Sequence, residues 1–323
     1  MRQKVFGVLL FVVIGCSYIY EWKIGGVSDW MVYYRSQIQN ATRVVNQSRN
    51  LFMEVQQSDD DRIRQRFENR RKHIKELCSH ELYREALSLQ NIFVEDKFKI
   101  MYCSIPKTGC TNWKRLFLVL RGLFRSTSDI QQTAVHTPKF HTTLKSKTRD
   151  EIATILKTYK KFMILREPFS RILSAYRNKF EENNRMSILL RNSFVPKIIR
   201  KYRTKPEQTK GIKSVTFREF INYLADTSNG LLTDPEEHWR EAYRLCYPCE
   251  IDYDYYGHFE TLTEDSTYII KALNLSIEYP QSTNPTNSSE TSILEEYYSQ
   301  ISSGEIEKLK DRYRIDMLLF DTV

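Results

Sequence analysis

The sequence predicts an α/β protein: a three-layer domain with a central parallel sheet and a phosphate-binding loop, preceded by an N-terminal transmembrane helix. From about residue 91, short apolar runs that suit strands alternate with runs of helical spacing. The clearest pairs are 98–105 with 111–121 and 161–165 with 168–182, and further helices are predicted near 216–225 and 235–245. Such alternation is typical of a parallel sheet covered by helices, with its ligand at the carboxyl ends of the strands. With 323 residues, 41% of them apolar, the chain can bury a sizeable core.

The N-terminus has the pattern of an uncleaved signal anchor over residues 5–22, after a cytosolic tail of residues 1–4. Basic residues precede an apolar run, and aromatic residues typical of a membrane interface end it. The run is slightly shorter than the usual span of about 20 residues, which suits a thin early-secretory membrane. The alternative is a cleaved signal peptide, but no small-x-small cleavage site is evident at the end of the run. We therefore expect the remainder of the chain to lie in the lumen.

Glycosylation sequons support a lumenal location, and the charge of the chain indicates an acidic partner. The acceptor residues of the four Asn-x-Ser/Thr triplets are Asn40, Asn46, Asn274 and Asn287. The net charge of +9 favours nucleic acid, anionic lipid or a polyanionic glycan as partner. A lumenal location excludes nucleic acid.

The segment after the anchor is predicted to be a lumenal stem over residues 23–90, followed by the catalytic domain over 91–323. Residues 23–58 are polar with few apolar residues. Residues 59–89 have helical spacing of apolar residues and many charges, which favours a solvated amphipathic helix over a binding element.

The run from residue 98 to 117 has the pattern of a strand, a tight loop and a helix. Unpaired N–H groups at a helix start attract anions, and Lys107 adds a full positive charge. Thr108, Thr111 and Asn112 add short hydrogen-bond donors. In the nucleotide-triphosphatase loop the lysine follows the second glycine, whereas here it precedes a single glycine, so ATP is not the expected ligand. The alternative is an ordinary strand-to-helix turn.

A second run repeats this pattern. The apolar strand at 161–165 is followed by Arg166, and Pro168 suits the first turn of a helix. Arg166 and Ser174 can both face an anion that lies over that helix start.

Together the two runs resemble the paired signatures of the Golgi carbohydrate sulfotransferases, most closely those of the chondroitin and dermatan 4-O-sulfotransferases. The likeness covers roughly residues 98–320 and includes Glu237-His238-Trp239, Cys246-Tyr247-Pro248-Cys249, Tyr253-Asp254 and Gly257 to Leu262. It implies a sulfotransferase fold related to the nucleoside kinases. It also implies that the first run holds the 5′-phosphosulfate end of 3′-phosphoadenosine-5′-phosphosulfate (PAPS) and the second its 3′-phosphate.

The residues that the resemblance assigns to PAPS lie in these two runs. The first run supplies Pro106, Lys107, Thr108, Gly109, Cys110, Thr111 and Asn112, and the second supplies Arg166, Glu167, Pro168, Phe169, Ser170, Arg171, Ile172, Leu173 and Ser174. Lys107 would stabilise charge on the leaving phosphate as cationic clamps do in phosphoryl transfer. The sequence contains no carboxylate cluster suited to a metal, and we expect that none is required.

The general base has several candidates. His136 lies between the two runs and matches a histidine at that distance in the 4-O-sulfotransferase-like sequences, so it is the first choice. His238 is the rival, and a carboxylate or His141 is the remaining alternative. A structural role is also possible for each histidine, because a lone histidine is usually a satisfied structural residue.

The cysteines predict disulfides, with a pairing that the sequence leaves open. Cys16 lies in the anchor and Cys110 in the phosphate loop, which leaves Cys78, Cys103, Cys246 and Cys249. The Cys-x-x-Cys pair could be half of a zinc site, but a second ligand pair with similar spacing is missing. Structural disulfides in an oxidising lumen are the better prediction.

The N-terminal pattern and the resemblance together imply a single-pass type II Golgi membrane enzyme that sulfates a glycosaminoglycan, at the 4-OH of N-acetylgalactosamine in chondroitin or dermatan. A basic stretch could contact this polyanion, although each of its residues alone suits a solvated loop: Lys197, Arg200, Lys201, Arg203, Lys205, Lys210 and Lys213. The alternatives are sulfation of terminal glucuronate at its 3-OH or of N-acetylgalactosamine on N-glycans, or an inactive glycan-binding relative.

Overall fold

The computed structural model describes residues 27–79, 88–181, 187–203, 214–226, 228, 236–280 and 290–321. The chain forms two compact units, Met1–Arg62 and Ile63–Val323, and the second contains the sheet and the predicted catalytic and donor-binding residues. The predicted tail and anchor lie outside the described residues. Within the described ranges, no helix combines the length and the apolar character needed to cross a membrane.

The sheet has four strands in the order β1-β2-β3-β4. The strands are β1 (Ile92–Glu95), β2 (Ile100–Cys103), β3 (Lys160–Leu165) and β4 (Tyr255–His258). β2 pairs with β3 and β3 with β4 in parallel, whereas β1 is an antiparallel edge strand joined to β2 by a tight turn. The predicted parallel sheet is therefore confirmed for β2, β3 and β4.

Helices lie between the strands, before β1 and after β4. In chain order they are α2 (Val27–Ser79), η1 (Leu89–Asn91), α3 (Cys110–Leu120), η2 (Thr127–Asp129), α4 (Gln132–Val135), η3 (Pro138–Phe140), η4 (Leu144–Ser146), α5 (Arg149–Thr158), α6 (Pro168–Tyr176), the π-helix η5 (Arg177–Glu181), α7 (Ile188–Tyr202), α8 (Phe217–Ala225), α9 (Ala242–Cys246), η10 (Phe259–Thr261), α10 (Leu262–Ala272), α11 (Thr291–Tyr298) and α12 (Ser303–Phe320).

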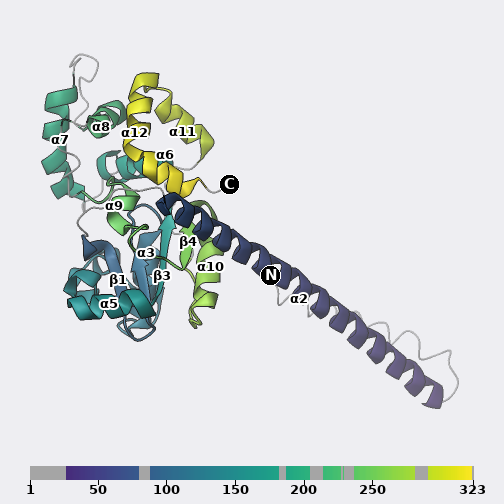
Figure 1. Cartoon of the computed structure of the whole chain (residues 1–323). Helices are drawn as coiled ribbons and strands as arrows, with labels where there is room; N and C mark the ends of the chain where they lie inside the picture. Colours follow the sequence, from purple (N-terminus) through teal and green to yellow (C-terminus); the bar gives the residue numbers. More distant parts are fainter. Residues whose placement is uncertain are drawn as a thin grey trace. The chain divides into compact units, whose positions relative to one another are not determined.

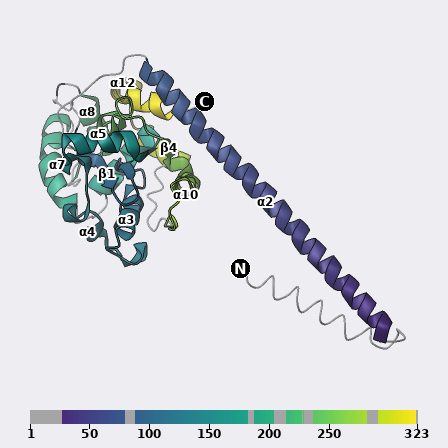
Figure 2. The same cartoon turned by 60° about the horizontal axis from the view of Figure 1, so that its bottom comes forward.

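Strand residues alternate between two buried faces, which produces the predicted three layers. Met101 and Cys103 face a cluster that includes side chains of α5, α9 and α12. Ile100 and Tyr102 face a cluster built with α3 and α10. A third cluster joins α6, α7, α8, α11 and α12 beyond the end of the sheet (Figure 1). Figures 1 and 2 both show α10 beside β4.

The last turns of α2 belong to the second unit. Ile63, Phe67 and Ile74 are buried in the two clusters on the sheet faces. The buried Arg70 donates to Asp265 of α10 at 2.6 Å. The predicted helix over 59–89 is thus confirmed as far as Ser79, with its apolar face packed in the core, and residues 80–87 lie outside the described part.

The disulfide prediction is confirmed, and the structure supplies the pairing. Cys78 bonds to Cys249 and Cys103 to Cys246, so the two cysteines of the Cys-x-x-Cys pair have different partners. Among the described cysteines, Cys110 forms no disulfide and is buried.

Two local expectations were wrong. The predicted helix over 235–245 is reduced to α9 (Ala242–Cys246), because residues 237–240 form a turn with backbone carbonyls bonded to distant side chains. The first part of the basic stretch, expected as a loop, is the end of α7, where Ile198 is buried against the third cluster. Residues 204–213 of that stretch lie outside the described residues.

Candidate active site

The loop between β2 and α3, called the cradle below, lies at the carboxyl end of the parallel strands. Lys107 and Gly109 both have left-handed backbone conformations, at φ +72° and +79°. Thr108 is buried, and its hydroxyl donates to the carbonyl of Ile105 at 2.8 Å, which closes the loop. The N–H of Asn112 donates to the carbonyl of Gly109 at 3.1 Å, but no described side chain caps the start of α3, so this helix start can bind an anion.

The start of α6 differs from the start of α3. The Glu167 carboxylate accepts from the N–H groups of Phe169 at 2.9 Å and Ser170 at 2.6 Å, and Pro168 occupies the first turn as predicted. The backbone of this helix start is therefore already capped by its own residue. A phosphate near α6 would have to be bound by side chains.

Arg166 brings the two predicted runs together. Its Nη1 donates to the carbonyl of Lys107 at 2.9 Å, and its guanidinium carbon lies 4.0 Å from the centroid of the Phe259 ring. Burial lowers the pKa of Arg166 to about 10, against the opposing charges of Glu260 and Glu167. The side chain therefore stays positive at neutral pH beside the cradle.

Arg171 connects the cradle to a second segment of the chain. Its side chain is 2% exposed, and it donates to the carbonyls of Pro106 at 3.2 Å and Arg240 at 2.6 Å. A longer bond of 3.4 Å reaches the carbonyl of Glu237, and Asp316 of α12 lies 3.7 Å away. These contacts are all within the protein. Arg171 therefore connects the loop between β2 and α3 to the turn at 237–240.

Other residues assigned to PAPS also have internal contacts. Asn112 donates from Nδ2 to the carbonyl of Pro280 at 3.2 Å. Phe169 packs against Tyr298, with ring centroids 5.1 Å apart. The remaining members that are buried are Pro106, Cys110, Pro168, Ser170, Ile172, Leu173 and Ser174, while Thr111 is partly exposed. Ile172 and Leu173 lie in the third cluster, where they support α6.

His136 follows α4, which lies beside α3 (Figure 2). Its Nε2 lies 3.3 Å from Nε2 of Gln132, whose carbonyl oxygen accepts from Arg115 at 3.1 Å. Much of the surface of His136 is exposed, but the ring itself is partly surrounded by protein and is therefore partly desolvated. This desolvation, with the charges of Lys114 and Lys179, lowers the pKa of His136 to about 4.

His238 lies in the turn that Arg171 holds. Its Nδ1 is hydrogen-bonded to Oε1 of Glu236, and its backbone N–H donates to the same oxygen at 3.1 Å. Burial lowers the pKa of His238, against the opposing effect of Glu236. Burial acts to raise the pKa of Glu236, but the hydrogen bonds and charge of His238, together with the charge of Lys179, outweigh burial and lower that pKa, so the carboxylate is ionised.

The other histidines in this unit with a lowered pKa have structural contacts. Nε2 of His141 must donate to the carbonyl of Val135, 2.7 Å away, because a carbonyl only accepts. His258 is buried and stacked on Phe320, and burial lowers its pKa to about 2. His141, an alternative base in the prediction, is thus tied to the backbone.

Lys179 and Glu236 act electrostatically on the candidate histidines, and the sequence analysis did not single them out. Lys179 lies on the π-helix η5, and its charge acts on His136, His238 and Glu236. It lies in Arg177-Asn178-Lys179-Phe180, shortly after Ser174 of the second run, and this position is a signal that could have drawn attention to it. Glu236 lies directly before the Glu-His-Trp motif, and only its contact with His238 marks it.

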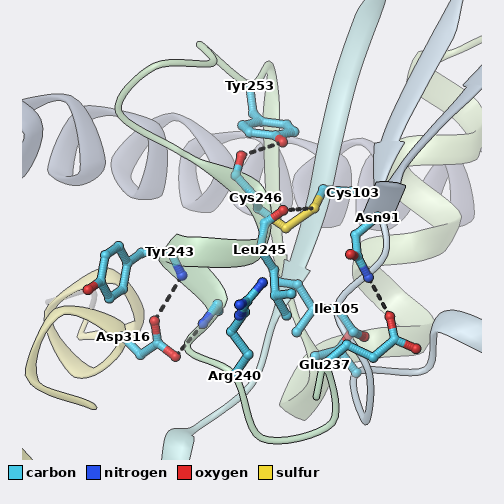
Figure 3. The surroundings of a disulfide bond; sticks show 12 residues. Asn91, Cys103, Ile105, Glu237, Arg240, Tyr243, Leu245, Cys246, Tyr253 and Asp316 are labelled. Carbon is cyan, nitrogen blue, oxygen red and sulfur yellow. Dashed lines mark hydrogen bonds between the residues drawn. A yellow bond between two sulfur atoms is a disulfide. The ribbon is translucent and has the colours of Figure 1, made fainter. Parts of the chain in front are cut away.

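A disulfide and a hydrogen bond join α9 and the turn at 237–240 to the edge of the sheet (Figure 3). Cys103 at the end of β2 is bonded to Cys246 of α9, and Asn91 donates to the Glu237 carboxylate at 2.5 Å. In the described ranges no group of three or more His, Cys, Asp or Glu side chains could hold a metal ion.

Two of the four predicted glycosylation acceptors can be located. Asn46 and Asn274 are exposed. The side chain of Asn40 and the whole of Asn287 lie outside the described residues.

Comparison with known proteins gives a consistent result. A family model described as "Sulfotransferase family" matches residues 90–321. Carbohydrate sulfotransferase 10 of Xenopus laevis is 35% identical over 240 residues, which are 72% of this chain and 67% of the relative. Carbohydrate sulfotransferase 9 of Homo sapiens is 36% identical over 267 residues, 79% of this chain and 59% of the relative. Carbohydrate sulfotransferase 8 of Mus musculus is 34% identical over 274 residues, 80% of this chain and 64% of the relative. The aligned regions span 59% to 67% of these relatives' lengths, and no solved structure matches the chain.

Proposed function

The chain belongs to the sulfotransferase family, and from this we propose that it transfers sulfate from PAPS to a hydroxyl of a glycosaminoglycan. The acceptor that we propose is the 4-OH of N-acetylgalactosamine in chondroitin or dermatan. The family implies PAPS as the donor, and the similarity to carbohydrate sulfotransferases supports a glycan as the acceptor.

The observation that carries the proposal is the meeting of the two runs. Lys107 follows β2 and Arg166 follows β3, and the 2.9 Å bond between them joins residues 59 positions apart at the carboxyl ends of adjacent parallel strands. Ligands of open α/β sheets bind at this edge. An uncapped helix start and two cations in one place fit a donor that carries phosphate groups at both ends.

The chemistry assigns a role to each group. The acceptor oxygen attacks sulfur in line with the phosphate oxygen that leaves, so negative charge grows on that phosphate. Lys107 and the N–H groups of α3 would stabilise this charge, because they are donors fixed in place before the reaction. Arg166 would bind the 3′-phosphate, and a histidine near the cradle would take the proton of the acceptor hydroxyl.

Exposed basic residues support an acidic acceptor. Lys197 and Arg200 lie exposed on α7. By contrast, Arg203 is paired with Glu219 at 2.7 Å, and Lys201 with Asp226 at 2.8 Å. We therefore propose Lys197 and Arg200, rather than the whole basic stretch, as contacts for carboxylate or sulfate groups of the glycan.

We also propose a Golgi location with the second unit in the lumen. The two disulfides support an oxidising compartment. The exposed sequons at Asn46 and Asn274 agree with a lumenal chain.

The experiment that tests the function is a transfer assay with isotopically labelled PAPS and a panel of desulfated glycans. We expect label on chondroitin or dermatan, and disaccharide analysis should place it at the 4-position of N-acetylgalactosamine. Label on terminal glucuronate or on N-glycans would correct the acceptor. Binding of glycans with no transfer to any of them would indicate an inactive glycan-binding relative.

A further inference from the structure

The two candidate histidines differ in which ring nitrogen can accept a proton. Glu236 is ionised, and a carboxylate only accepts hydrogen bonds, so Nδ1 of His238 carries the proton that binds it. The neutral ring then has its lone pair on Nε2. Within the described part of the chain no group bonds to Nε2 of His238, and 22% of this side chain is exposed. His238 can therefore accept a proton from a bound hydroxyl without breaking a contact.

His136 has the opposite arrangement. Arg115 has only donors, so the carbonyl oxygen of Gln132 must face it and the Gln132 amide N–H must face Nε2 of His136. The lone pair of the neutral ring is then used by Gln132, and the ring proton sits on Nδ1. His136 would have to break this bond before it could act as a base.

The segment that carries His238 is held by buried contacts on both sides of the histidine. The carbonyl of Trp239 accepts from Tyr313 at 2.5 Å, and Trp239 is buried among Phe180, Phe194 and Phe220. The carbonyls of Glu237 and Arg240 accept from Arg171, which also holds Pro106 beside Lys107. The buried guanidinium of Arg171 therefore sets the position of the loop between β2 and α3 relative to the turn at 237–240, which contains His238.

We propose that His238 is the general base of the transfer and that Glu236 is its positioning residue, which fixes the Nδ1–H tautomer. The proposal rests on the proposed sulfate transfer. Arrangements in which a carboxylate orients a histidine that takes a hydroxyl proton recur on unrelated folds, because the carboxylate also stabilises the imidazolium that forms.

One bond forms and one bond breaks in the proposed transfer. The acceptor oxygen forms a bond to sulfur while the bond from sulfur to the 5′-phosphate oxygen breaks, and the 3′,5′-bisphosphate leaves with the electron pair. The hydroxyl proton moves to Nε2 of His238, and Glu236 balances the new positive charge. The proton then passes to solvent and the neutral histidine is restored.

The charged groups around His238 come from more than one element. Glu236 and Glu237 lie on its own segment, Lys179 on η5, and His136 after α4. Lys179 favours the neutral ring and the two glutamates favour the charged ring. The pH profile of the enzyme should therefore respond to Glu236 through His238.

The test compares the full chain with His238→Ala, Glu236→Gln and His136→Ala, and uses Glu237→Gln as the matched control. kcat is measured against pH, and calorimetry with 3′,5′-bisphosphate shows whether each variant folds and binds. In the wild type we expect kcat to fall at low pH as the base is protonated, and we call this fall the acid limb. His238→Ala should lower kcat by about 10²–10⁴-fold and should lack the acid limb, and added imidazole should restore part of the rate. Glu236→Gln should lose at least about tenfold in kcat at unchanged donor KM, with its acid limb moved to lower pH, because a charge that favours the imidazolium is gone. His136→Ala should keep the wild-type limb. Glu237→Gln, which removes a charge that acts on His238 but no hydrogen bond to its ring, should move the limb less than Glu236→Gln does.

A second readout is independent of turnover. Nitrogen-15 NMR of the histidine rings should show the proton of His238 on Nδ1 in the wild type, and a changed tautomer or pKa in Glu236→Gln. If His136→Ala loses the limb while His238→Ala keeps it, or if Glu236→Gln matches the wild type in both readouts, the proposal is overturned. If the wild type transfers no sulfate but the NMR result is as expected, the sulfotransferase function fails and the Glu236–His238 pair stands.

Discussion

Lys107 has a backbone conformation that is unfavourable for its residue type. Its φ of +72° lies in the left-handed region, which costs a non-glycine residue roughly 1–2 kcal/mol. Strained residues of this kind cluster at functional sites, where the surrounding structure holds them in place. The conformation turns the Lys107 carbonyl to Arg166 and supports a role of this lysine in the reaction.

Two substitutions at position 107 should separate stability from activity. Lys107→Ala keeps the strain and should lower kcat by roughly 10²–10³, the usual loss for one transition-state donor. Lys107→Gly should lose as much activity, yet exceed Lys107→Ala in unfolding free energy by about 1 kcal/mol, because glycine adopts this φ without strain. Urea unfolding and the transfer assay measure the two effects. A kcat within threefold of wild type in both variants would remove Lys107 from the mechanism.

At the scale of elements, the π-helix η5 extends α6 toward the His238 turn. Such segments are uncommon and often occur at functional sites. Lys179 on this segment is buried, and its charge lowers the pKa of both His136 and His238. The element therefore helps to keep both rings neutral near neutral pH.

Lys179→Met should move the acid limb of kcat to higher pH. A cation lowers the pKa of a nearby histidine, so its removal raises that pKa, and the active neutral form is lost at a higher pH as the solution is acidified. The measurement is kcat from pH 5 to 8, with the exposed Arg149→Ala as control. A limb that stays in place or moves to lower pH would show that this charge does not act on the base.

The end of α2 is an element that the domain needs for stability. Replacing Arg70 by Met should lower the free energy of unfolding by about 3 kcal/mol, the lower end of the range for breaking a buried ion pair. The lower end applies because Arg66 and the N–H of His258 still contact Asp265. Lys72→Ala, which changes an exposed residue of the same helix, should cost under about 0.5 kcal/mol in the same urea titration. Equal losses in the two variants would contradict the role of the buried pair.

At the scale of the whole chain, the two disulfides join distant segments of the second unit. They close separations of 171 and 143 residues, and each holds a segment near residues 246–249 to another part of the unit. Cys103–Cys246 joins the strand before the cradle to the helix after the His238 turn, so it links stability to the site.

Replacing Cys103 and Cys246 together by Ser should lower the free energy of unfolding by about 2–5 kcal/mol, the range for loss of a native disulfide. It should also lower kcat, whereas Cys78→Ser with Cys249→Ser should reduce stability with a smaller effect on kcat, because that bond lies at α2. Urea unfolding and the transfer assay provide the readouts. Unchanged unfolding midpoints in both double variants would contradict the pairing.

The sequence alone determined the elements whose signals are local. The run around Lys107 and the run around Arg166 each place a strand, a turn and a helix within about twenty consecutive residues, so their patterns predicted β2 with α3 and β3 with α6. The sequence also predicted that four cysteines form disulfides, although it left their pairing open. The local nature of these signals also explains the errors, since the turn at 237–240 has helical spacing but gives its carbonyls to Arg171 and Tyr313.

Only the tertiary structure decided how these parts meet. The pairing of Cys78 with Cys249, the internal contacts of Arg171 and the approach of Lys179 to His238 join residues that lie roughly sixty to 170 positions apart. The proposed choice between His136 and His238 has the same origin. Gln132 faces the ring of His136 and Glu236 faces the ring of His238, and these hydrogen bonds are set by packing rather than by the position of either histidine in the sequence.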